Sequence, residues 1–96
     1  MNRYFKFPEM WRQVLNEQRA TAADWLVAVD LLNRAKHSRV MKFSNERAAA
    51  LGLHRNTKRR SLDRLAAWGL IWFRSRRGAS PMVTVKWLDN RRPSGR

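Results

Sequence analysis

Apolar residues recur at helical spacing along four segments of the chain. Residues that begin or end helices stand between these segments. Thr21 and Asp24 resemble a capping box, and Gly52 and Gly69 can adopt the positive φ that often follows a helix. The pattern therefore predicts four helices, at residues 8–19, 22–36, 45–51 and 55–68.

Three further segments show the alternation, or the β-branched and aromatic residues, that are typical of strands. They are residues 39–43, 70–76 and 82–87. Residues 77–81 contain Gly78 and are expected to form the loop of a hairpin. The predicted fold is an α+β domain, mainly α with a small β-hairpin. Its order is helix, helix, short strand, helix, helix, strand, loop, strand.

The second predicted helix carries more apolar surface than one core face needs. The apolar arc of residues 22–36 is wide, so this helix is either central in the domain or shared with a partner chain. The aromatic residues of segment 1–20 either cover the core or form a dimer seam. The candidate seam residues are Phe5, Phe7, Trp11, Leu15 and Trp25.

The length of 96 residues, 44% of them hydrophobic, indicates one domain with its own core. We expect this domain to cover residues 1–88, with residues 1–20 as an N-terminal extension and residues 89–96 as a basic tail. The chain has no cysteine, which excludes disulfides and thiolate metal sites. No apolar run approaches the roughly 20 residues of a membrane span, so a cytoplasmic protein is expected.

The charge is strongly positive and unevenly distributed. Residues 1–38 hold six bases and four acids (6 − 4 = +2), whereas residues 39–96 hold fifteen bases and three acids (15 − 3 = +12). Such an excess attracts polyanions and accelerates association with them. Nucleic acid is therefore the favoured partner, and an anionic membrane surface is a poor second.

The third and fourth predicted helices are joined by a short glycine-containing turn, which is the spacing of a helix-turn-helix. Arg55 and Asn56 are expected at base edges, because arginine can bond guanine and asparagine can bond adenine. Arg60 and Arg64 are expected at phosphates. The candidate DNA contacts of this helix are Arg55, Asn56, Thr57, Lys58, Arg59, Arg60 and Arg64.

The alternative for this helix is a solvated charged face. Residues 54–64 hold five bases and one acid, Asp63, which can pair with Arg59 or Arg60. Surface helices usually mix the two signs of charge, so this excess favours DNA contact.

The predicted hairpin and the start of the third helix offer further contacts. Arginines near a narrow hairpin tip can reach a minor groove or a phosphate line, although edge-strand charges also deter aggregation. Ser44 either holds a phosphate or simply caps its helix. The residues concerned are Arg74, Arg76, Arg77, Gly78 and Ser44.

About half of the chain resembles bacterial winged helix-turn-helix DNA-binding domains, broadly those of MarR-like and GntR-like regulators. The resemblance implies a dimer that reads repeated DNA, with residues 55–60 in the major groove and residues 76–78 in the wing. Lys58 stands where such domains often have an aliphatic residue, and its stem is expected to pack while its amine reaches a phosphate. His54 replaces the usual Ser or Thr cap. The resemblance rests on residues 44–46, 51–53, 55–65, 68–71, 77–78 and 81–85.

Three functions remain open. The first is a small transcription regulator, a repressor acting as a dimer on double-stranded DNA. The second is a DNA-binding adaptor of a plasmid or mobile element, for partition, replication or excision. Both place the protein at the bacterial nucleoid or a plasmid. The third is an RNA- or protein-binding module, which only Trp72 favours among the aromatic residues. Two separated histidines and no paired carboxylates predict no enzyme, metal, cofactor or small-molecule ligand.

Overall fold

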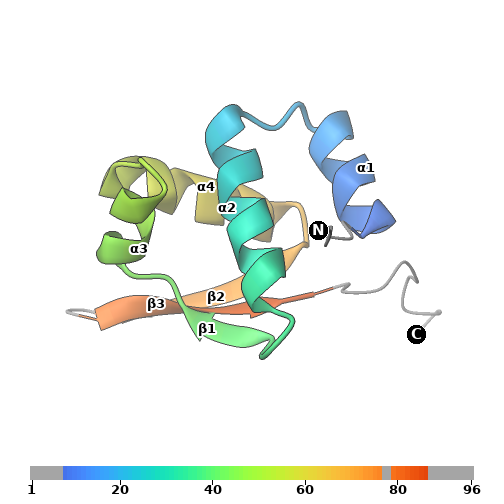
Figure 1. Ribbon diagram of the computed structural model, residues 1–96. Coiled ribbons are helices and arrows are strands. Elements are labelled where there is room, and N and C mark those ends of the chain that lie inside the picture. The colour runs from blue at the N-terminus through green and yellow to red at the C-terminus, as the bar shows by residue number, and fades with distance from the viewer. Residues whose placement is uncertain (1–7, 77–78, 87–96) are drawn as a thin grey trace, which may run out of the picture.

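The computed structural model describes residues 8–76 and 79–86, and there the chain forms four helices and a three-stranded antiparallel sheet (Figure 1). The predicted α+β class is confirmed. No helix in the described ranges is long and apolar enough to cross a membrane. The elements are α1 (Glu9–Glu17), α2 (Ala22–Arg34), β1 (Val40–Lys42), α3 (Asn45–Ala50), α4 (Arg55–Ala67), β2 (Ile71–Arg76) and β3 (Ala79–Val85).

Local caps determine where the helices begin and end. The predicted capping box of α2 is confirmed, because the Thr21 hydroxyl accepts from the Asp24 N–H and the Asp24 carboxylate accepts from the Thr21 N–H. Helices α3 and α4 end at Gly52 and Gly69, with φ of 81° and 82°. In both, the glycine N–H and the next N–H return to helix carbonyls, which is a Schellman motif. Arg19, with φ of 55°, takes the same place after α1.

The sheet has the order β1-β3-β2, and all four helices lie on one side of it (Figure 1). Met41, Val83 and Phe73 lie opposite one another across the three strands and point toward the helices. Their neighbours along each strand point to the other side, which no described element covers.

The hairpin loop is shorter than predicted. Residues 79–81 were expected in the loop but belong to β3, the central strand. Pro81 has no N–H to donate, and it lies where the β2–β3 pairing shifts register between Arg74 and Arg76. The Pro81 carbonyl still accepts from the Phe43 N–H, at 3.0 Å. A bulge therefore lets a proline enter the strand.

Helix α1 is part of the core. Trp11 and Leu15 are fully buried within the single chain, and the Trp11 indole N–H donates to the Lys86 carbonyl at 2.7 Å. The prediction that these two residues form a dimer seam is therefore wrong, since they present no surface to a partner. Phe5 and Phe7 lie outside the described residues.

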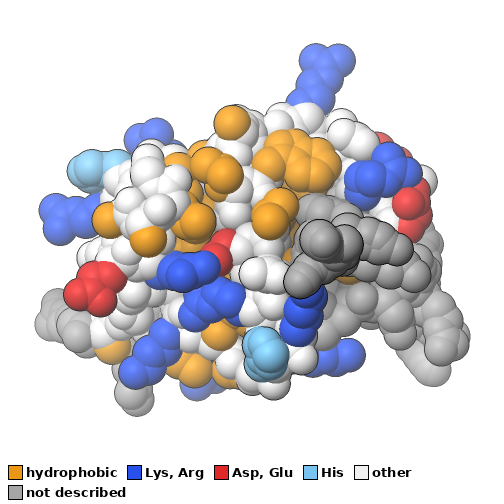
Figure 2. Space-filling view, viewed as in Figure 1, with side chains coloured by type: hydrophobic (Ala, Val, Ile, Leu, Met, Phe, Trp, Pro, Cys, Tyr) orange, Lys and Arg blue, Asp and Glu red, His pale blue; other side chains and the backbone are white. Residues whose placement is uncertain are grey.

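Helix α2 is central, yet it does not bury its whole apolar arc. Val27 and Leu31 are fully buried, whereas Leu26 and Val29 are exposed. Figure 2 shows hydrophobic side chains gathered over α2, between α3 and α1. Trp25 is half-buried at the same surface.

Candidate nucleic-acid interface

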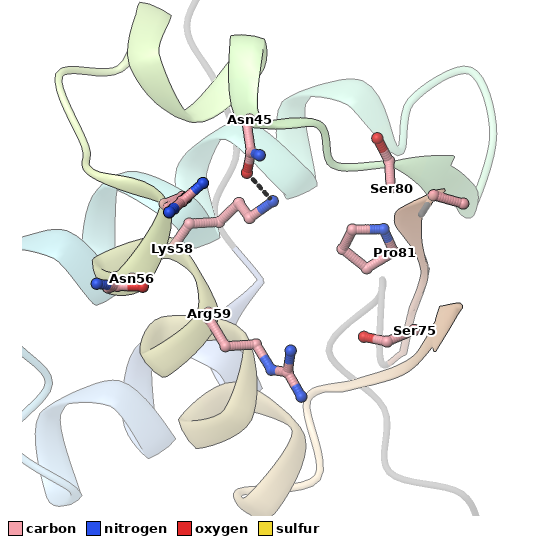
Figure 3. Close-up of a pocket in the computed structure, with 9 residues that line it drawn as sticks. Asn45, Asn56, Lys58, Arg59, Ser75, Ser80 and Pro81 are labelled. Carbon is pink, nitrogen blue, oxygen red and sulfur yellow. Dashed lines mark hydrogen bonds between the residues drawn. The ribbon is translucent and has the colours of Figure 1, made fainter. Parts of the chain in front are cut away.

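The rotation of α4 about its axis is determined by Lys58, which faces inward and is only 6% exposed. Its ammonium group donates to the Phe43 carbonyl at 3.1 Å and to Oδ1 of Asn45 at 2.8 Å (Figure 3). Burial lowers the pKa of Lys58, and the nearby charge of Arg59 lowers it further. The prediction of a DNA contact by Lys58 is wrong, because its amine is engaged between β1 and α3.

The inward position of Lys58 turns the other basic residues outward. Arg55, Asn56, Arg59 and Arg60 are all exposed, and Thr57 is half-buried. Leu62 and Leu65 lie on the opposite side of α4 and are fully buried. The helix therefore has one face fastened to the core and one face that presents three arginines and an amide.

Asp63 shares this exposed face. Its carboxylate lies 3.5 Å from Nε of Arg59, which confirms the pairing anticipated at that spacing. Both side chains are more than half exposed, so the pair contributes little to stability. Arg59 can thus leave Asp63 for a phosphate at small cost.

Arg64 is engaged within the protein. Its guanidinium bonds both carboxylate oxygens of Asp24, at distances of 2.9–3.1 Å, although the two residues are 40 positions apart. The Asp24 side chain is completely buried. Asp24 engages Nε and Nη2 of Arg64, while the Arg64 side chain remains 38% exposed. The phosphate contact expected of Arg64 stays a prediction.

A second carboxylate of α2 holds α3. Asp30 accepts from Nε of Arg47 at 2.9 Å and also pairs with the second donor of that guanidinium. Arg34 bonds the other oxygen of Asp30, at 3.2 Å, and the Lys42 carbonyl, at 2.7 Å. Two acids on different faces of α2 therefore hold α3 and α4 in position.

The start of α4 is capped by His54. Its Nδ1 accepts from the Asn56 N–H at 3.0 Å, so the imidazole carries no proton on that nitrogen in this arrangement. The cap places Arg55 and Asn56 in the first turn, where they project from the end of the helix. Ser44 caps α3 in the same way, because its hydroxyl accepts from the Arg47 N–H at 3.0 Å. That hydroxyl is thus engaged within the protein.

A groove of about 490 Å³ separates the start of α4 from the β2–β3 hairpin. Arg59 extends from α4 toward this hairpin (Figure 3), and its guanidinium carbon lies 6.0 Å from the centre of the Phe73 ring. No acidic residue is among the described residues that line the groove. They are Asn45, Arg55, Asn56, Lys58, Arg59, Ser75, Ala79, Ser80 and Pro81.

The structure describes only some of the predicted wing residues. Arg74 is exposed, but it lies against Trp72 on the side of the sheet that faces away from the helices. Arg76 pairs with Ala79 through the backbone. The side chain of Arg76, together with Arg77 and Gly78, lies outside the described residues.

Sequence reasoning missed the residues that hold the helices in place. Asn45, which fixes Lys58, and Ser75 and Ser80, which line the groove, have no local signature. Asp24 was recognised only as part of a capping box, and Asp30 was given no role. A buried carboxylate and its distant arginine leave no periodic signal in the sequence.

The Asp24–Arg64 pair predicts an acid-dependent loss of stability. Burial alone would raise the pKa of Asp24, but hydrogen bonds from Arg64 and from the Thr21 backbone hold it below its ordinary value. Because the folded pKa is the lower one, the stabilisation is complete above the unfolded value of about 3.9 and disappears as pH falls through the folded pKa. We expect the difference in unfolding free energy between the wild-type chain and Asp24→Asn to narrow from about pH 5 to about pH 2.

Urea denaturation of both proteins at each pH checks this expectation. The other carboxylates titrate in both proteins, so the difference isolates Asp24. A difference that stays constant across the range would contradict the proposed role of the carboxylate.

Among the described residues, no group of three or more histidines, aspartates and glutamates is placed to hold a metal ion. Comparisons of the chain with protein-family models, with curated proteins and with solved structures found no significant match.

Proposed function

We propose that this protein is a winged helix-turn-helix protein that binds double-stranded DNA through the exposed face of α4. One observation carries the proposal: Arg55, Asn56, Arg59 and Arg60 project from a helix whose opposite face is fixed by buried contacts. In this arrangement α3 braces α4, and the β2–β3 hairpin forms the wing.

The dimensions and chemistry of α4 suit a major groove. Its 13 residues span about 20 Å, and a groove about 12 Å wide admits one helix. Arg55 and Asn56 lie in the first turn, the part of a recognition helix that contacts base edges. Arg60 lies further along the exposed face and suits a phosphate.

Within this proposal the protein is a small transcription regulator, most simply a dimeric repressor. The exposed apolar side of α2, with Leu26 and Val29, supports such a dimer in place of Trp11 and Leu15. No specific feature of the described structure favours the plasmid-adaptor alternative, which would use the same DNA-binding face.

The proposal predicts duplex binding that weakens steeply with salt. Selection from random duplexes should yield a preferred sequence, and log K for that duplex should fall linearly with log salt concentration. Arg60→Gln should make this slope shallower by about 0.9, the contribution of one phosphate contact. Fluorescence anisotropy across a salt series measures the slope.

Arg12→Gln is the matched control. It removes the same charge from the exposed surface of α1, at the opposite end of the molecule from α3 (Figure 1). Absence of duplex binding at low salt would refute the proposal. Equal slopes for the two variants would remove Arg60 from the interface.

A further inference from the structure

The side of the sheet that faces away from the helices has its own composition. The registers place six outward-pointing residues in two rows across the three strands. One row is Val40, Thr84 and Trp72, and the next is Lys42, Met82 and Arg74. We call these six residues the outer sheet face.

The outer sheet face exposes an unusual amount of apolar surface. Trp72 is 55% exposed, Val40 48% and Met82 39%. These are three of the five large hydrophobic residues that the described chain exposes. Single exposed apolar residues are common, but a group on one flat surface marks a binding site. The group lies on a sheet side that no described element covers (Figure 1).

The charges on this surface have one sign. None of the three strands contains an acidic residue, and Lys42 and Arg74 stand beside the apolar group. The Arg74 guanidinium carbon lies 5.6 Å from the centre of the Trp72 ring, yet more than half of Trp72 remains exposed. The surface therefore joins an accessible aromatic ring to cations that no acid on these strands neutralises.

This combination matches the chemistry of unpaired nucleotides. Bases stack on exposed aromatic rings, while lysine and arginine neutralise the phosphates between them. In a duplex the base faces are hidden, so Trp72 has no base to stack on. A purely apolar partner would leave Lys42 and Arg74 unmatched.

We propose that the outer sheet face binds single-stranded nucleic acid, with a base stacked on Trp72 and phosphates held by Lys42 and Arg74. This site is separate from the exposed face of α4, which contacts the duplex in the proposed function. The two sites can therefore be tested independently.

The test measures binding of fluorescein-labelled oligo-dT and oligo-U, each about 12 nucleotides long, to the full chain at low salt. Trp72→Ala should weaken binding roughly 5- to 150-fold, the range for losing one stacked base. Trp72→Phe keeps a ring and should lose less. Lys42→Gln should reduce the salt slope by about 0.7, whereas Arg12→Gln should leave it unchanged.

The same variants are then measured on the selected duplex. Trp72→Ala should leave duplex affinity unchanged, whereas Arg60→Gln should lower duplex affinity. On single strands, Arg60→Gln should not cause the loss of base stacking that Trp72→Ala causes. Failure of duplex binding alone would refute the proposed function and leave this inference standing. No binding of either oligonucleotide, or binding that Trp72→Ala does not weaken, overturns the inference. Equal losses of affinity on single strand and duplex would also overturn the inference, because one site would then serve both.

Preference for oligo-U over oligo-dT would identify RNA as the ligand, and the reverse would identify DNA.

Discussion

Arg64→Met is expected to lower the free energy of unfolding by about 3 kcal/mol, the lower end of the range for breaking a buried ion pair. Asp24 is completely buried, and Arg64 supplies three of its hydrogen bonds. Methionine preserves most of the side-chain length but leaves the carboxylate with an unpaired charge in the interior. Urea denaturation followed by circular dichroism measures the change.

Arg60→Met is the matched control, because Arg60 lies on the same helix but is exposed. We expect it to change the unfolding free energy by less than about 0.5 kcal/mol. The double variant Asp24→Asn, Arg64→Met should be more stable than Arg64→Met alone, since no buried charge remains unpaired. If Arg64→Met and Arg60→Met proved equally mild, Arg64 would not be fixing α4.

The second large effect concerns sequence recognition. Arg55→Ala should remove the preference for one base pair in the selected duplex, at a loss of about 1–3 kcal/mol on the preferred sequence. The reason is that Arg55 lies in the first turn of α4, borders the groove beside the hairpin and is exposed. Repeating the selection with the variant measures the change.

Arg60→Ala distinguishes sequence recognition from phosphate contact. A phosphate contact carries no sequence information, so this variant should weaken all duplexes alike and keep every preference. Were Arg55→Ala to retain the full preference at every position, Arg55 would be a phosphate contact. The assignment of the first turn to base edges would then fall.

Features that depend on a few neighbouring residues could be predicted from the chain. The capping box of Thr21 and Asp24 and the terminating glycines Gly52 and Gly69 satisfy hydrogen bonds within one turn of each helix, and all were confirmed. The same holds for alternation in a strand. In β2, Trp72 is exposed, whereas its neighbours Ile71 and Phe73 are buried and half-buried.

Features that depend on distant partners could not be predicted. From the sequence Lys58 is expected to be a basic residue on the surface. In the structure its ammonium group is buried and donates to the Phe43 carbonyl and the Asn45 amide oxygen. Arg64 was treated like Arg60 because both are arginines on one helix, and only Asp24, 40 positions away, separates their roles.

The amino-acid sequence by itself determined the positions of the helices, the α+β class and the concentration of positive charge after residue 38. Each of these depends on local hydrogen bonds, on periodicity or on composition. Only the tertiary structure decided which basic side chains are engaged within the protein. A lysine or arginine is engaged wherever folding brings a carbonyl or a carboxylate to it. The tertiary structure also placed all four helices against one side of the sheet, so that no described element covers the other side.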